Sequence, residues 1–187
     1  MNANPPLTHY PAAARWLHWL SVLAIAVAFL AMEVREEMAR EHVWRPFVTQ
    51  LHFWAGLSVL AMLPFRFWLH RRGPVPPIIP VPGAVAAWAA RLTHFAIYLA
   101  LLVQPLLGLF TAAADGKIVR LPFSDIALPP VIGVDEALAG RLEDLHGGLA
   151  EILLVLIGLH VLAALWHHFV RRDNTLRRMR RPPGAAD

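Results

Sequence analysis

The chain has 187 residues, of which 57% are hydrophobic and only 16% are charged, a composition too apolar for a water-soluble domain of this size. It contains no cysteine, which excludes disulfides, iron–sulfur clusters and thiolate ligation of a metal. The formal net charge of +4 comes from basic residues grouped beside apolar segments, a distribution typical of the flanks of membrane spans rather than of nucleic-acid-binding surfaces.

Four apolar segments are each long enough to cross a bilayer, which takes about 20 helical residues. They cover residues 16–34, 47–69, 92–114 and 149–170. Because backbone polar groups cannot remain unpaired in lipid, we expect segments of this length and unbroken hydropathy to be helices. The sequence therefore predicts an all-α membrane protein, in which residues 1–187 form a single domain built as a four-helix transmembrane bundle.

The first span carries His18 close to its start, and the second span carries His52 close to its own start. The first span is too long for the apolar core of a cleaved signal peptide, and Glu33 and Arg35 stand where small residues would mark a cleavage site. We therefore expect the first helix to remain. The connection between these two spans is short and charged.

The connection between the second and third spans is rich in proline and is expected to form a stiff strap over residues 73–82. Basic residues flank it, namely Arg66, Arg71, Arg72 and Arg91, and further arginines fill the C-terminus. The other two connections are acidic on balance. The positive-inside rule therefore places both termini in the cytoplasm.

The third span carries His94 near its cytoplasmic start, and the residues after it form the longest non-spanning segment, 115–144. A connection of this length is usually functional or a lid. It leads to His146 at the outer end of the fourth span, which also carries His160 and His167.

Histidines inside spans are costly and usually mark function. His146 and His160 are 14 residues apart, which corresponds to a rise of about 21 Å on nearly the same helix face. When the histidines are paired by their depth in the bilayer, His52 pairs with His146 on the outer side and His18 pairs with His160 on the cytoplasmic side. Each pair can supply two axial nitrogens to one iron, so the sequence predicts two stacked b-type haems and electron transfer.

Two histidines leave alternatives open. His167 competes with His160 as the cytoplasmic ligand, but its interval of about 31 Å from His146 would push an iron towards the headgroups. We interpret His167 as a quinone contact or as an interfacial residue beside His168. No unpaired histidine remains at the depth of His94, and we expect His94 to bind a haem propionate or a quinone. Any one of these histidines, taken alone, can also be a packing residue.

Small and acidic residues in the spans are candidates for supporting roles. Glu151, inside the fourth span, can orient a ligand or a propionate through water. Several glycines allow close approach of a macrocycle or, more commonly, of a neighbouring helix, namely Gly56, Gly108, Gly147, Gly148 and Gly158. His9, His42 and His70 lie outside the spans and are expected to be solvated.

Several short motifs along the chain resemble those of the bacterial cytochrome b561 family, in particular the type that works as a superoxide oxidase, a superoxide:ubiquinone oxidoreductase. The likeness covers nearly the whole chain and keeps the motif order. The motifs are Arg15-Trp16-Leu17-His18-Trp19, Ala31-Met32-Glu33-Val34-Arg35, Pro76-Pro77-Ile78-Ile79-Pro80, Gly158-Leu159-His160, Trp166-His167-His168 and Asp173-Asn174-Thr175-Leu176. The proline strap and the last motif are the most specific.

The resemblance implies that His18, His52, His146 and His160 are the haem ligands and that the protein lies in the bacterial inner membrane. It also implies that superoxide reduces the outer haem and that ubiquinone accepts the electrons near His167. No catalytic residue separate from the haems is expected.

Superoxide is a small anion, so positive residues near the outer haem would steer it. Glu143 and Asp144, just before His146, oppose this effect. The candidates for supplying positive charge are Lys117, Arg120 and Arg141.

A second function fits the same sequence. The protein can be a membrane haem subunit that passes electrons between quinone and a periplasmic redox partner protein. Such a subunit would co-purify with its partner, whereas the enzyme would react with superoxide alone. Apart from lipid, the enzyme would have quinone and superoxide as partners, whereas the haem subunit would have quinone and a protein. Nucleic acid is not an expected partner.

Overall fold

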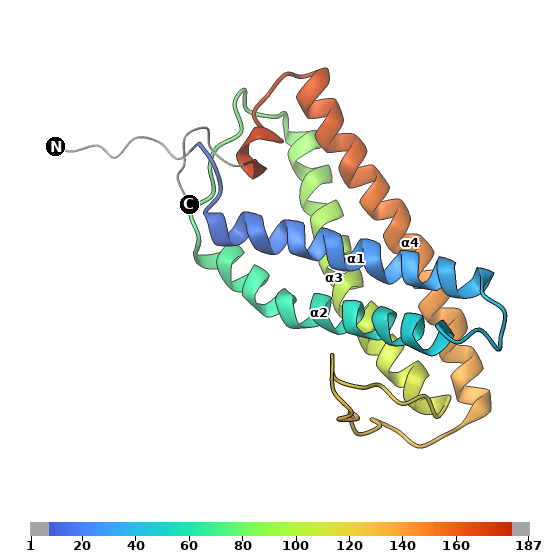
Figure 1. The fold of residues 1–187 in the computed structure, drawn as a ribbon. Coiled ribbons are helices and arrows are strands. Elements are labelled where there is room, and N and C mark those ends of the chain that lie inside the picture. The colour runs from blue at the N-terminus through green and yellow to red at the C-terminus, as the bar shows by residue number, and fades with distance from the viewer. Residues whose placement is uncertain (1–7, 181–187) are drawn as a thin grey trace.

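The computed structural model describes residues 8–180, which form four long helices and a short terminal 3-10 helix (Figure 1). The elements are α1 (Ala12–Glu37), α2 (Arg45–Arg72), α3 (Ala84–Ala114), α4 (Glu136–Phe169) and η1 (Arg177–Met179). All four long helices are long and apolar enough to cross a membrane. The prediction of an all-α four-helix membrane fold is confirmed.

Two helices begin well before the apolar segments found by hydropathy. α3 begins at Ala84 rather than at residue 92, and α4 begins at Glu136 rather than at residue 149. The start of α4 is fixed by Asp135, whose side-chain Oδ1 accepts a hydrogen bond from the Leu138 backbone N–H at 3.0 Å. In α4 the added turns contain Glu136, Arg141, Glu143 and Asp144, so their hydropathy is too low to be counted with the span. The connection before α4 is correspondingly shorter, residues 115–135.

The helices are arranged as two hairpins, α1 with α2 and α3 with α4, which are inclined to one another and meet chiefly where α2 packs on α3 (Figure 1). We call the end that holds the 38–44 and 115–135 connections the loop end. The opposite end, with the 73–83 connection and η1, is called the terminal end. There the Tyr10 backbone N–H donates to the Arg178 carbonyl at 3.0 Å, which brings the two ends of the described chain together.

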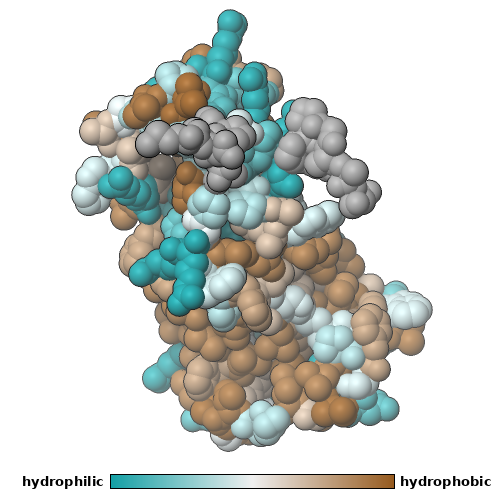
Figure 2. Space-filling model, turned by 90° about the vertical axis from the view of Figure 1, so that its left-hand side faces the viewer, coloured by the Kyte–Doolittle hydropathy of each residue, from teal (hydrophilic) through white to brown (hydrophobic). Residues whose placement is uncertain are grey.

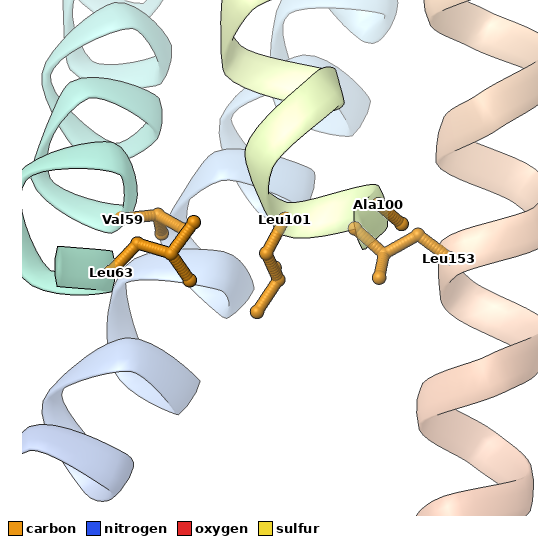
Figure 3. Close-up of a cluster of buried hydrophobic side chains, with 5 residues drawn as sticks. All are labelled: Val59, Leu63, Ala100, Leu101 and Leu153. Atoms are coloured by element: carbon orange, nitrogen blue, oxygen red, sulfur yellow. The ribbon is translucent and has the colours of Figure 1, made fainter. Parts of the chain in front are cut away.

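A small apolar core lies between the two ends of the bundle. It consists of buried side chains from three helices, Val59, Leu63, Ala100, Leu101 and Leu153 (Figure 3). On α4, Leu153 lies midway between His146 and His160, about 10 Å along the axis from each. An apolar layer therefore separates the two levels at which these histidines lie.

Most large apolar side chains point away from this core. Figure 2 shows them as a broad brown surface over the body of the molecule, with hydrophilic side chains concentrated towards the terminal end at the top. Trp16, Leu23, Phe95 and Leu162 are each more than half exposed. A continuous apolar exterior of this extent matches a lipid environment and not water.

The C-terminal segment is bound to the proline strap, although the two are 95 residues apart in sequence. The buried Arg178 side chain donates through Nη1 to the carbonyl of Pro76, which is itself fully buried. Asn174 donates through Nδ2 to the Pro77 carbonyl at 3.0 Å and accepts from the Ile79 N–H at 2.9 Å. The strap and the tail together close the terminal end of the bundle.

Candidate metal centres

At the loop end, His52 of α2 faces His146 of α4, with ring centroids 6.0 Å apart. The Nδ1 atom of His52 lies 2.9 Å from the Ala28 carbonyl oxygen on α1. A carbonyl can only accept, so Nδ1 carries a proton, and in the neutral ring Nε2 then keeps its lone pair. This is the tautomer, and the kind of backbone anchor, that metal-binding histidines use.

The position of His146 is fixed by α3. A Cβ added at Gly108 would lie 3.1 Å from His146 Cε1, so the ring occupies the space that only glycine leaves. Gln104 on the same helix donates through Nε2 to the His146 carbonyl at 2.9 Å. The His146 Nδ1 atom is buried without a hydrogen-bond partner among the described residues. Of the five glycines considered above, Gly108 is the one whose added Cβ meets a neighbour within 4 Å.

At the terminal end the structure brings three imidazoles together. The ring centroids of His18 on α1 and His160 on α4 are 6.4 Å apart. His94 of α3 lies nearer to His160, at 5.2 Å. His94, which depth alone leaves without a partner, is therefore a neighbour of the predicted cytoplasmic pair.

The ring separations can be compared with those of a metal held between two imidazoles. With metal–nitrogen bonds of about 2 Å, the ring centres lie about 6 Å apart. The His52–His146 and His18–His160 separations fit this value, whereas the His94–His160 separation is too short. Within residues 8–180 no three His, Asp or Glu side chains converge on one point. A metal here would take two ligands from the chain, which suits a macrocycle that supplies the remaining nitrogens.

His167 has an acidic partner beyond the end of α4. Its Nδ1 lies 2.5 Å from Oδ2 of Asp173, a side chain that is only 1% exposed. Burial raises the pKa of Asp173, but hydrogen bonds from His167 and Thr175 outweigh it and hold the pKa below its usual value. Asp173 therefore stays ionised, and only Nε2 of His167 remains free for another partner. The sequence identified Asp173 only as part of a motif, because its return towards the helix depends on the fold of the tail.

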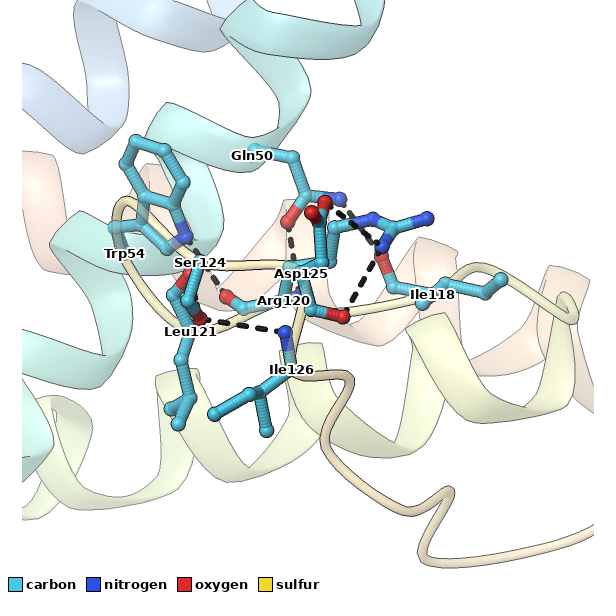
Figure 4. Close-up of polar contacts among 8 residues, drawn as sticks. All are labelled: Gln50, Trp54, Ile118, Arg120, Leu121, Ser124, Asp125 and Ile126. Atoms are coloured by element: carbon cyan, nitrogen blue, oxygen red, sulfur yellow. Dashed lines mark hydrogen bonds and ion pairs between the residues drawn. The ribbon is translucent and has the colours of Figure 1, made fainter.

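The 115–135 connection folds against the start of α2 (Figure 4). Trp54 donates through Nε1 to the Arg120 carbonyl at 2.8 Å, and Gln50 bonds both the Arg120 N–H and the Ile118 carbonyl. The Arg120 guanidinium lies 3.8 Å from the Asp125 carboxylate, which offsets its charge. Arg141, the third steering candidate, lies exposed on α4, as do Glu143, Asp144 and Glu151.

An open cavity of about 480 Å³ lies at the loop end, near the start of α2, and four of its twelve lining residues are basic. Its basic residues are Arg35, Arg40, Arg45 and Lys117. Thr49 and Phe53, which flank His52 in sequence, also line it. Lys117 is paired with Asp115 at 2.5 Å, and Glu41 is the acidic residue in the lining.

Three of these cations were not predicted as steering residues. By sequence, Arg35, Arg40 and Arg45 belong to a connection that is acidic on balance. In the structure Arg35 donates to Thr49 and Arg45 donates to the Arg35 carbonyl, which gathers their charges on the side of α2 that carries Thr49 and Phe53. The net charge of a segment does not tell which of its side chains lie together. The short length of this connection was the available signal, because it keeps the side chains near the start of α2.

Comparisons with known proteins extend over nearly the whole chain. The model of the family described as prokaryotic cytochrome b561 matches residues 9–182. The probable superoxide oxidase CybB of Yersinia pestis is 33% identical over 163 residues, which cover 87% of this chain and 90% of the relative. Cytochrome b561 homolog 1 of Escherichia coli (strain K12) is 32% identical over 88% of this chain and 92% of its own. Cytochrome b561 homolog 2 of the same strain is 29% identical, with coverages of 91% and 90%.

Proposed function

This chain belongs to the prokaryotic cytochrome b561 family of b-type haem proteins that transfer electrons in the membrane, and we propose that it moves electrons from superoxide to ubiquinone through two haems. One haem is held by His52 and His146, and the other by His18 and His160. The observation that carries the proposal is the pair of ring separations, 6.0 and 6.4 Å, at two levels of one bundle. A haem iron with two imidazole ligands is six-coordinate and cycles between ferric and ferrous states by single electrons.

The loop end is proposed to face the periplasm and the terminal end the cytoplasm of a bacterial inner membrane. The arginines after α4 and around the 73–83 connection support this orientation through the positive-inside rule. The His52–His146 pair then lies on the periplasmic side, where superoxide would arrive.

The donor assignment is supported by charge as well as by the name of one relative, a probable superoxide oxidase. The basic cavity beside His52 attracts a small anion, and focusing of this kind raises association rates by about tenfold or more. We assign the main steering role to Arg40, since the Arg35 and Arg45 side chains are hydrogen-bonded in place. Lys117 lines the same cavity and contributes less, because Asp115 pairs with it. Arg120 and Arg141 remain secondary candidates.

The acceptor is proposed to bind at the terminal end, near His167. Asp173 accepts a hydrogen bond from Nδ1 of His167 and fixes the ring, which leaves Nε2 as the atom that can contact a quinone oxygen. The reaction balances as two superoxide ions and two protons with one quinone, which yield two dioxygen molecules and one quinol. His94 is a second candidate for contact with the quinone, since it lies too close to His160 to share an iron with it.

The proposal is tested with the purified haem-loaded protein in nanodiscs, without any partner protein. Pulsed superoxide should reduce the haems, followed at the α-band by stopped flow, and added ubiquinone should reoxidise them. If superoxide reduces the haems slowly or not at all while a chemical reductant works, the donor assignment is wrong. If ubiquinone does not reoxidise them, the acceptor assignment is wrong.

A haem subunit that serves a periplasmic partner protein is the second candidate. The loop end carries large exposed apolar side chains outside the helices, among them Phe123 (95% exposed), Ile126 and Val134. Exposed apolar groups of this kind favour docking. Recovery of a stoichiometric soluble protein with the membrane fraction, together with inertness towards superoxide, would support this function.

A further inference from the structure

Arg66 is a charged residue in the terminal half of α2. It lies six residues before Arg72, the last residue of the helix, and so about 9 Å from that end. By sequence it belongs to the basic flank of the second connection. In the structure it turns towards the histidine cluster instead, within electrostatic reach of His18, His94 and His160.

The guanidinium of Arg66 is held by two neighbouring helices. Its Nη1 donates to the Leu17 carbonyl on α1 at 3.1 Å, one residue before His18. The group lies over the ring of Tyr98 on α3, 5.5 Å from the ring centroid. These contacts fix the cation at the level of His18.

These contacts do not provide partners for all the N–H donors or for the charge of Arg66. Its Nε atom is buried and has no hydrogen-bond partner among the described residues, and no acidic side chain of residues 8–180 pairs with it. Charged groups inside a span are costly and are almost always paired. A guanidinium presents five N–H donors in a planar fork that matches a carboxylate.

We infer that Arg66 binds a carboxylate of the group held between His18 and His160, namely a porphyrin propionate. The inference depends on the proposed haem ligation at this end and does not depend on the identity of the electron donor or acceptor. The propionate supplies the anion that Arg66 lacks, and the guanidinium donates hydrogen bonds to this carboxylate where water is excluded.

This pairing has a consequence for the direction of electron transfer. A cation beside a haem disfavours the ferric form, which carries one more positive charge, and therefore raises the midpoint potential. At the loop end the comparable histidine pair is anchored by a backbone carbonyl and a glycine. Arg66 thus raises the potential of the terminal-end haem above the value it would have without the guanidinium, which favours electron transfer to that haem.

The test is an equilibrium redox titration of the haem-loaded protein, followed at the α-band, for Arg66→Gln and Arg66→Lys. We expect Arg66→Gln to shift one of the two components to lower potential and to leave the other unchanged, whereas Arg66→Lys should stay close to wild type. The same shift should persist in a His52→Ala background, which retains the terminal-end haem only. Arg71→Gln is the matched control. Like Arg66, Arg71 is an α2 arginine that lies over an aromatic ring, here that of Phe67, but its side chain is exposed.

If Arg66→Gln does not retain the terminal-end haem, the haem-to-protein ratio replaces the potential as the readout. Loss of one haem in Arg66→Gln and its retention in Arg66→Lys and Arg71→Gln supports the inference. Unchanged potentials with both haems bound, equal shifts of both components, or the same shift in Arg71→Gln overturns it. Because neither superoxide nor quinone is present, failure here is distinct from failure of the proposed substrates.

Discussion

At the loop end of the bundle His52 and His146 face each other between α2 and α4, whereas at the terminal end His18, His94 and His160 share one space with Arg66. The loop-end pair is fixed by the Ala28 carbonyl and by Gly108, and Arg35 of the cavity lining is within electrostatic reach of His52. The terminal-end cluster adds a third imidazole and a cation, and His167 with Asp173 lies further along α4.

The difference between the two ends fits the two half-reactions proposed above. Outer-sphere transfer from a small anion requires access and positive charge outside the haem, which the cavity at the loop end provides. Reduction of a quinone requires two electrons and two protons, and so it needs titratable groups. At the terminal end, His167 with Asp173 beside it is the group proposed for this step.

The largest expected effect separates the two ends by their ligands. His52→Ala and His18→Ala should each lose about one haem of two, because a single axial imidazole holds the iron poorly. His94→Ala should keep both, as its ring lies too close to His160 for an iron between them. The haem-to-protein ratio measured as the pyridine haemochrome decides the matter. Two haems retained in His18→Ala together with one lost in His94→Ala would reverse the assignment at the terminal end.

Asp173→Asn should slow the terminal-end half-reaction alone. The asparagine offers a neutral and weaker acceptor to Nδ1 of His167 and holds the ring less firmly, so quinone-driven reoxidation should fall by about ten- to hundredfold. Superoxide-driven reduction and haem content should not change. Because the pKa of Asp173 lies below its usual value, the wild-type carboxylate is ionised at neutral pH and the difference between the two proteins is fully present there. The exposed Asp125→Asn serves as the control, and equal slowing in both variants would refute the role of the pair.

Gly108→Val should affect the loop end alone. The added side chain meets the His146 ring, since even a Cβ would lie 3.1 Å from Cε1. We expect the loop-end haem to be released about tenfold faster in a haem-transfer assay, while the terminal-end haem is retained. Gly148→Ala is the matched control, because a Cβ there meets nothing within 4 Å. Release of both haems at equal rates would show a general loss of packing instead.

The smallest expected effect concerns the cavity at the loop end. The double variant Arg40→Gln with Lys117→Gln removes two positive charges, and the rate of haem reduction by superoxide should fall by about a few-fold, with a weaker dependence on salt. Arg141→Gln removes a charge outside the cavity lining and should change the rate less. If Arg141→Gln lowered the rate as much as the double variant does, the effect would come from the net charge of the protein rather than from the cavity.

Much of the bundle could be predicted from sequence because hydropathy and helix rise are local properties. The four helices and the depths of His18, His52, His146 and His160 follow from segment length and from a rise of about 1.5 Å per residue. The helix ends could not be found in the same way. α4 begins at Glu136 because Asp135 caps it, in turns that lie outside the apolar segment.

Depth along a helix does not specify which side chains meet across the bundle, and here the tertiary structure decides. The rotation of each helix and the inclination of the two hairpins bring His94 beside His160 and turn Arg66 inwards from a basic flank. The fold of the tail places Asp173 against His167, and a short connection gathers Arg35, Arg40 and Arg45 around one cavity. The sequence by itself determined that histidines lie at two levels in a membrane, because burying them there is costly. Helix packing decided which charges and hydrogen bonds accompany each level, because such contacts join residues far apart in the chain.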